Sequence, residues 1–334
     1  MLRTPPVYPV IAGLLCVALP SHAAQSLADC ALIRSDELRL GCYDALAREL
    51  PAKPDGEATG GSQALQSEGP GRKELLAGER LEQERATANN AFVLTPHQRN
   101  YLLPLTYNAS LNEAPWDQQY PDEPMQEVEA KFQFSVKALI WDDILGERTS
   151  LWGAYTQENW WQVYNESAPF RESNYQPELF VAIENNWQAL GFTNTLLTLG
   201  LNHQSNGRGG DFSRSWNRVV GQAIFERRRM TLSARAWYRL PEGDDNDDNP
   251  GILDNYGYGD LKGVWKYRQH EFSMMLRNNL RGDNKGAVEL EWTFPLSPRF
   301  KGYVQYFYGY GENLIDQDSL TNRIGVGISL TDLL

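Results

Sequence analysis

The sequence has few cysteines, a deficit of positive charge and, beyond its first residues, no long apolar run. It contains three Cys, and its 31 Lys and Arg stand against 43 Asp and Glu, which gives a net charge of -12. This acidic balance argues against nucleic acid as a partner, because phosphate binding needs a basic surface. Without a run for a membrane helix, two classes remain: a soluble secreted protein, and a transmembrane β-barrel, whose strands are only half apolar.

The first 24 residues have the pattern of a secretory signal. Arg3 gives a basic start, residues 10–19 are apolar, and residues 21–24 supply small side chains for cleavage. The alternative is a membrane anchor, but the apolar run falls well short of the ~20 residues that a spanning helix needs. We therefore expect residues 1–24 to be a signal peptide that is removed on export.

The region from 25 to 95 differs in composition from the rest of the chain. Its two cysteines, Cys30 and Cys42, form an even pair in an exported protein, which favours a disulfide over two free thiols. Residues 51–90 are rich in Gly, Ser, Glu, Ala and Pro, and they can bury too little apolar area to order themselves. We interpret 25–95 as a periplasmic Cys-containing segment with a flexible linker.

From about residue 98 onward, apolar and polar side chains alternate. Residues 132, 134, 136, 138 and 140 are apolar, whereas Lys131 and Lys137 occupy the alternate positions. Glu289 and Glu291 interleave with apolar neighbours in the same way. Such segments need water on one face and an apolar environment on the other. About twelve segments have the ~10-residue length of an outer-membrane strand, and an even number is expected of a bacterial barrel. The strands are predicted to begin near Asn100, Gln126, Ser150, Tyr175, Thr193, Arg214, Met230, Tyr256, Glu271, Gly286, Phe300 and Thr321.

Aromatic clusters fit the interfacial girdles of such a barrel, namely Trp160 with Trp161, residues 306–308, and Tyr256 with Tyr258. A soluble β-sandwich is the alternative, but it leaves the charged faces of these long alternations unexplained. The predicted fold is therefore all-β: an antiparallel transmembrane β-barrel of about 12 strands over residues 96–334, with a short N-terminal periplasmic segment.

One predicted hairpin carries side chains that could perform chemistry. His203 and Ser205 have the same parity as Leu197, Leu199 and Leu201, so they extend an apolar row on one face of a strand. If that row faces lipid, the histidine and the serine face lipid too.

The second arm of this hairpin supplies an amide. Asn217 faces His203 if the hairpin turns about Gly209 and Gly210. Histidine can take the proton of a serine hydroxyl, and an asparagine oxygen can fix the histidine tautomer. Taken singly, an isolated histidine is usually structural, and Asn-Gly and Gly-Gly pairs are ordinary turn signals. The other histidines of the mature chain are less suitable: His97 precedes the first predicted strand and His270 lies in an apparent turn.

Several segments in the same order resemble the outer-membrane phospholipase A family. They are Tyr155 to Gln157 with Trp160 to Gln162, Ser167 with Pro169 to Glu172, Asn174 with Tyr175, Asn202 to Arg208, Ser213 to Arg218, Asp247 to Pro250, and Gly309 to Glu312 with Leu314 to Asp316. We find no such resemblance over residues 25 to about 95.

This resemblance implies a twelve-stranded barrel in the outer membrane of a Gram-negative bacterium. It implies calcium-dependent hydrolysis of sn-1 and sn-2 acyl esters of phospholipids and lysophospholipids, by an enzyme active as a homodimer. Ser205 matches the nucleophile, His203 the base and Asn217 the orienting amide.

The resemblance also assigns ligands and a dimer contact. Ser213 matches a hydroxyl ligand of calcium, Arg208 a carbonyl ligand, and Ser167 a carbonyl ligand from the second subunit. Gln157 matches a glutamine at the dimer contact; its parity favours the outer face over the lumen. A second calcium site of the family uses two aspartates, but Gly210 stands where one is expected, with Asp211 beside it, and only Asp248 matches.

Two other functions are compatible with a barrel. A non-enzymatic porin or adhesin has no reason to place His203, Ser205 and Asn217 on lipid. A barrel protease clusters carboxylates and histidine at its rim, and residues 242–248 are acidic, but no histidine lies near them in sequence. We therefore expect that loop to be simply solvated.

Overall fold

The computed structural model describes residues 30, 32–35, 38–43, 95–243, 247–297 and 300–330. The chain divides into two units, Met1–Gln66 and Ser67–Leu334. In the first, Cys30 and Cys42 form a disulfide, which confirms the predicted pairing. The predicted signal peptide and linker lie outside the described residues. No helix among those residues is long and apolar enough to cross a membrane.

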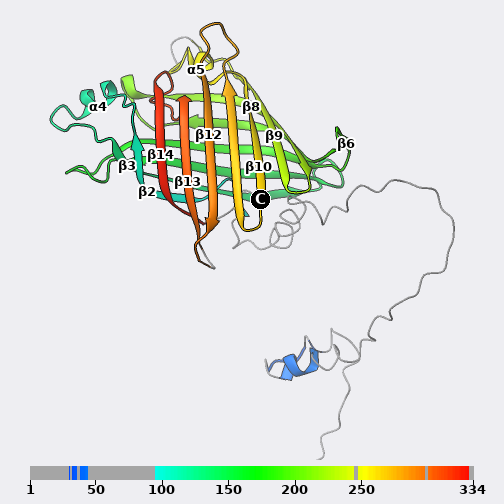
Figure 1. Ribbon diagram of the computed structural model, residues 1–334. Helices are drawn as coiled ribbons and strands as arrows, with labels where there is room; N and C mark the ends of the chain where they lie inside the picture. Colours follow the sequence, from blue (N-terminus) through cyan, green and yellow to red (C-terminus); the bar gives the residue numbers. More distant parts are fainter. Residues whose placement is uncertain are drawn as a thin grey trace, which may run out of the picture. The chain divides into compact units, whose positions relative to one another are not determined.

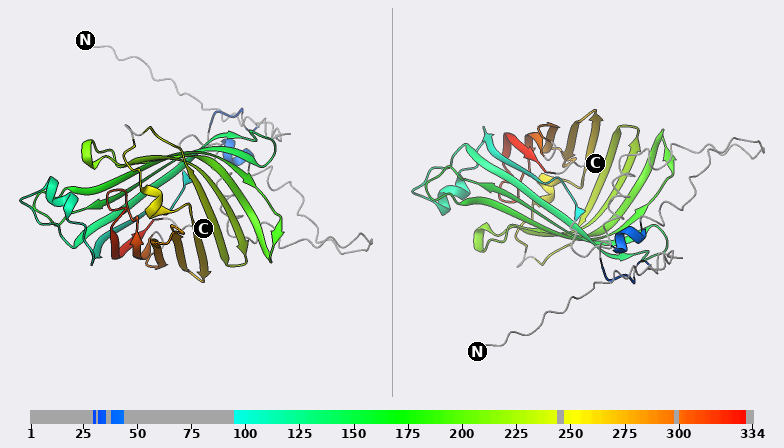
Figure 2. Two further views of the ribbon diagram at one scale, coloured as in Figure 1. Left: turned by 90° about the horizontal axis from the view of Figure 1, so that it is seen from above. Right: turned by 90° about the horizontal axis from the view of Figure 1, so that it is seen from below.

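Twelve long antiparallel strands form a closed barrel, which confirms the predicted fold class (Figure 1). The ring closes because β3 pairs with β4 as well as with β2. Views from above and from below show the strands curving round a common interior (Figure 2). The strands are β2 (Tyr101–Asn108), β3 (Val128–Asp142), β4 (Thr149–Trp161), β5 (Phe170–Glu184), β7 (Phe192–Ser205), β8 (Ser215–Arg227), β9 (Met230–Arg239), β10 (Gly259–Tyr267), β11 (His270–Asn278), β12 (Gly286–Pro295), β13 (Lys301–Tyr310) and β14 (Leu320–Ser329). Short elements complete the barrel unit: β1 (Thr95–Pro96), β6 (Gln188–Ala189), α4 (Ala114–Gln119), α5 (Ile252–Tyr256) and the 3-10 turn η2 (Gly210–Phe212).

Two strand starts differ from the sequence prediction. β5 begins at Phe170 rather than near Tyr175, because Phe170 pairs with Trp161 and extends the β4–β5 hairpin. β10 begins at Gly259 rather than near Tyr256, because Tyr256 ends helix α5. Both differences come from packing between segments, which the local alternation does not reveal.

The prediction of aromatic girdles is wrong for three residues. Trp160 is fully buried, with the Lys131 amino group 5.0 Å from its ring centroid. Phe307 and Tyr256 are also buried, and Tyr256 packs with Trp216. Because neighbours in a strand point to opposite faces, an aromatic doublet can place only one ring on the lipid side.

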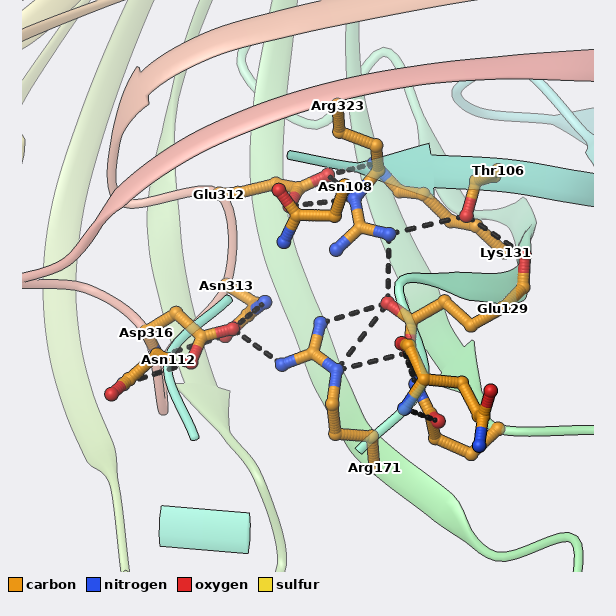
Figure 3. A network of polar contacts seen from close by, with 12 residues as sticks. Thr106, Asn108, Asn112, Glu129, Lys131, Arg171, Glu312, Asn313, Asp316 and Arg323 are labelled. Atoms are coloured by element: carbon orange, nitrogen blue, oxygen red, sulfur yellow. Dashed lines mark hydrogen bonds and ion pairs between the residues drawn. The ribbon is translucent and has the colours of Figure 1, made fainter. Parts of the chain in front are cut away.

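Buried ion pairs join strands of the barrel to the β13–β14 loop (Figure 3). Arg171 of β5 contacts Glu129 at 3.0 Å and Asp316 at 2.5 Å. Arg323 of β14 contacts Glu129 at 2.8 Å and Glu312 at 2.9 Å. These pairs connect three strands to the β13–β14 loop, and they place buried charges of opposite sign together in this part of the interior.

Glu312 lies in that loop, directly after β13. Burial alone would raise the pKa of its carboxyl group, but Arg323 and Lys131 lower this pKa to about 2. The Glu312 carboxylate is therefore ionised at neutral pH and depends on its two cationic partners.

We expect Arg323→Ala to destabilise the barrel strongly, because Glu129 and Glu312 would each lose a buried partner. Removing one member of a buried ion pair costs about 3–5 kcal/mol. The measurement is the urea concentration at the midpoint of unfolding, with heat-modifiable gel mobility as the readout of the folded fraction. Arg281→Ala is the control, since Arg281 and Asp254 form an ion pair with both side chains 45% exposed, and exposed pairs contribute little to stability. Equal losses from the two variants would contradict a structural role for the buried pairs.

Candidate functional site

The hairpin of β7 and β8 pairs His203 with Asn217 and Ser205 with Ser215 across its two strands. Asn206 organises the connecting loop: its side-chain oxygen accepts from the backbone amides of Arg208 and Arg214, and its amide donates to the Phe212 carbonyl at 2.9 Å. The chain turns through η2, close to the predicted Gly-Gly pair.

The outward row of β7 carries His203 and Ser205. Leu199 and Leu201 are 60% and 55% exposed on the barrel surface. The alternate residues Asn202 and Gln204 line the interior, which contains a cavity of about 400 Å³. On β8, the inward residues Arg218, Val220 and Gln222 alternate with Asn217. The structure therefore places all three predicted triad residues on the outer face.

The imidazole and the amide are joined by a hydrogen bond. His203 Nδ1 lies 2.9 Å from Asn217 Oδ1. With Nδ1 donating to the amide oxygen, Nε2 is left to accept a proton. Ser205 follows two residues along the same face. Within the described part of the chain, no hydrogen bond joins the Ser205 hydroxyl to His203.

The other two histidines of the barrel unit lie in different surroundings. His97, between β1 and β2, has its Nε2 3.1 Å from Glu178 Oε2, and both residues line the interior cavity. His270 begins β11, and its Nδ1 accepts from Trp292 Nε1 at 3.2 Å. Of the three, His203 is the one that the structure places beside an asparagine on the outer face.

The expected calcium ligand Ser213 lies beside a carboxylate. Its hydroxyl donates to Asp248 Oδ2 at 2.6 Å, and the Ser215 hydroxyl lies 3.3 Å from the same oxygen. These three side chains offer only oxygen donors, which are the ligands that calcium prefers. The set adjoins Ser205 through the Ser205–Ser215 pair, so its chemistry and its place fit a calcium ion. Sequence reasoning missed Ser215, which neither spacing nor motif distinguishes.

The side chains of the two expected carbonyl ligands contact their own chain. The Arg208 guanidinium donates to the Gln119 side chain of α4 and to the Arg171 carbonyl, and its Nε lies 3.3 Å from Glu172 Oε2. Ser167, in the β4–β5 loop, lies 2.7 Å from both carboxylate oxygens of Glu123. Arg208 thus ties the β7–β8 hairpin to its neighbours through its side chain.

Gln157 lies in the same outward row of the sheet as the serine. It pairs with Tyr175 of β5, and Tyr175 pairs with Ser205 of β7. Its neighbours Thr156 and Glu158 line the interior, so Gln157 faces outward. Its amide donates to Asn159 at 2.9 Å. A polar side chain among lipid-facing residues favours a protein partner.

The acidic loop between β9 and β10 is not simply solvated, as the sequence had suggested. Glu242 Oε1 accepts from Asn217 Nδ2 at 2.8 Å. Asp247 pairs with Arg239 at 2.5 Å. Sequence distance hides these contacts, because residues 217 and 242 meet only when β8 and β9 are paired.

Comparisons with known proteins agree with this geometry. Residues 77–330 match the family model described as Phospholipase A1. The chain is 37% identical to phospholipase A1 of Klebsiella pneumoniae, covering 73% of this chain and 85% of the relative. It is 34% identical to a putative phospholipase A1 of Neisseria meningitidis, covering 98% of this chain and 96% of the relative. This second match corrects the expectation that residues 25–95 share no resemblance.

The fold matches solved structures of outer membrane phospholipase A. An active-site mutant from Escherichia coli superposes with a TM-score of 0.70 at 34% identity, covering 74% of this chain and 95% of the other. The Salmonella typhi protein, solved as a dimer with bound calcium, gives the same TM-score, identity and coverage. The chain belongs to the phospholipase A1 family of outer-membrane enzymes.

Proposed function

We propose that this outer-membrane phospholipase hydrolyses sn-1 and sn-2 acyl esters of phospholipids and lysophospholipids with Ser205, His203 and Asn217, as a calcium-dependent homodimer. The observation that carries this proposal is the 2.9 Å contact between His203 Nδ1 and Asn217 Oδ1 on the lipid-facing side. A membrane enzyme whose substrate is the surrounding lipid needs its catalytic groups on that face.

The proposed mechanism moves one proton through His203. Asn217 accepts from Nδ1–H, so Nε2 is free to take the Ser205 proton as the oxygen attacks the ester carbonyl. The protonated histidine then gives that proton to the departing lipid alcohol, which leaves an acyl group on Ser205. Water, activated by the same Nε2, cleaves this acyl ester and releases a fatty acid.

Calcium would be held by the Ser213 hydroxyl, the Arg208 carbonyl and the Ser167 carbonyl of a second subunit. Asp248 and Ser215, which contact each other beside Ser213, would complete the oxygen environment. When bound, the ion supplies a positive charge that stabilises the negative oxygen formed during attack.

A homodimer accounts for the outward polar residues of β4. Gln157 faces lipid in the row that leads to Ser205, and a two-fold axis through this face would give its amide a partner from the other copy. The Salmonella typhi relative was solved as a dimer with calcium. Sharing the calcium site between subunits would keep monomers inactive and protect the membrane.

The direct test is hydrolysis of position-labelled phosphatidylethanolamine by the purified protein in mixed detergent micelles with calcium. We expect free fatty acid and lysophospholipid from both acyl positions. A heat-modifiable, correctly folded barrel that releases no fatty acid with calcium would overturn the proposal and favour a non-enzymatic porin or adhesin.

We expect removal of residues 25–94 behind an intact signal to leave an inserted and active barrel. The Klebsiella pneumoniae enzyme matches this chain over 247 residues, which is 85% of its own length, so most of that enzyme corresponds to the barrel. Kinetics of the truncated and full proteins in the same micelles test this. Insertion without activity would show that the N-terminal region takes part in catalysis.

A further inference from the structure

The orienting amide of the triad lies between an imidazole and a carboxylate. Asn217 Oδ1 is 2.9 Å from His203 Nδ1, and Asn217 Nδ2 is 2.8 Å from Glu242 Oε1. Glu242 therefore lies one amide group away from the base, at the start of the β9–β10 loop.

The backbone fixes this position. The Leu240 amide donates to the Asn217 carbonyl at 2.8 Å, which holds the loop beside β8 directly before Glu242. Arg239, the cation nearest in sequence, contacts Asp247 at 2.5 Å and the Asn249 carbonyl at 2.8 Å. Among the described residues, Glu242 has no ion pair, and its side chain is half-buried. The Glu242 carboxylate therefore interacts with the Asn217 amide and with no cationic side chain among the described residues.

We propose that Glu242 is a positioning residue of the phospholipase, which orients the Asn217 amide and supplies the negative charge that an asparagine lacks. This proposal rests on the proposed function of His203 and Ser205. A carboxylate can only accept hydrogen bonds, so it binds the amide NH2 and keeps the amide oxygen on His203. Rotation of the amide by half a turn would set two donors, NH2 and Nδ1–H, against each other.

The second contribution is electrostatic. During attack the imidazole becomes a cation, and an amide stabilises that cation less than an aspartate would. Glu242 polarises the amide and adds a negative charge behind it, which favours the imidazolium. Ser213, the proposed calcium ligand, contacts the carboxylate of Asp248. Glu242 contacts Asn217 instead, so its proposed role does not involve the calcium ligands.

The first test compares Glu242→Gln and Glu242→Ala in the full-length protein at saturating calcium. Gln keeps an acceptor oxygen but loses the charge, whereas Ala loses both. We expect kcat to fall about tenfold in the Ala variant and less in the Gln variant, with KM and the calcium requirement unchanged. Asp283→Asn, which removes an exposed carboxylate from the β11–β12 loop, is the charge-matched control and should keep wild-type kcat. A wild-type kcat in Glu242→Ala would overturn the proposal.

The second test is a double-mutant cycle, which measures coupling between two groups. In an Asn217→Ala background, Glu242→Gln should have no further effect on kcat. In an Asn217→Asp background two carboxylates would meet, so Glu242→Gln should raise kcat instead of lowering it. An equal loss of kcat in all three backgrounds would show that Glu242 acts elsewhere and would sink the proposal. An inactive wild-type protein would instead contradict the proposed function itself.

Discussion

Ser205→Ala is expected to abolish hydrolysis while leaving a folded barrel. Loss of the nucleophile of a serine triad lowers kcat by about 10⁴-fold or more, because the remaining electrostatic groups cannot replace the attacking oxygen. The side chain lies on the outer face at the end of β7, and it carries none of the interior ion pairs. The substitution should therefore change chemistry without changing stability.

Three measurements on each variant distinguish these effects: fatty acid release, heat-modifiable gel mobility and labelling by a sulfonyl fluoride that reacts with activated serines. We expect Ser205→Ala to lose release and labelling and to keep normal mobility. Ser233→Ala is the control, because it makes the same change on the inner face of β9 and should retain all three properties. Turnover close to wild type in Ser205→Ala would remove this serine from the mechanism.

The sequence predicted the barrel well because one rule governs every strand. A side chain faces lipid or the polar interior, so alternation reveals both the strand and its outward face. The same parity placed His203, Ser205 and Asn217 together, since both arms of one hairpin are local in sequence. Their contact depends only on the register of β7 with β8.

Features that depend on distant segments were not predictable in this way. Arg171 meets Asp316 across 145 positions, and Glu242 meets Asn217 only through the β8–β9 pairing. Tyr256 is an aromatic residue of the type found in girdles, but it ends helix α5 and is buried against Trp216. The predictions of calcium and of a homodimer came from the family resemblance alone. The pattern of residues in one chain does not reveal a ligand site that two subunits would share.

Chelation of calcium is expected to abolish hydrolysis and to shift the protein from dimer to monomer. If the ion binds a site that exists only in the dimer, its binding stabilises the dimer, by about 2.7 kcal/mol when free calcium is 100 times the dissociation constant. Removing calcium removes that stabilisation. The measurement is chemical crosslinking in detergent, with calcium and then with chelator, alongside fatty acid release.

Variants at Ser213 test whether this proposed calcium ligand couples calcium binding to dimerisation. Ser213→Ala removes the hydroxyl, so it should weaken calcium binding and dimerisation together. Ser213→Asn keeps an oxygen on a longer arm, so activity should return in part at high calcium. Arg208→Ala is a poorer test, because the Arg208 side chain also holds the hairpin against Glu172 and Gln119. An unchanged dimer fraction with full activity in chelator would rule out the shared site, whereas loss of activity from an intact dimer would place calcium in the chemistry and leave assembly to the contacts around Gln157.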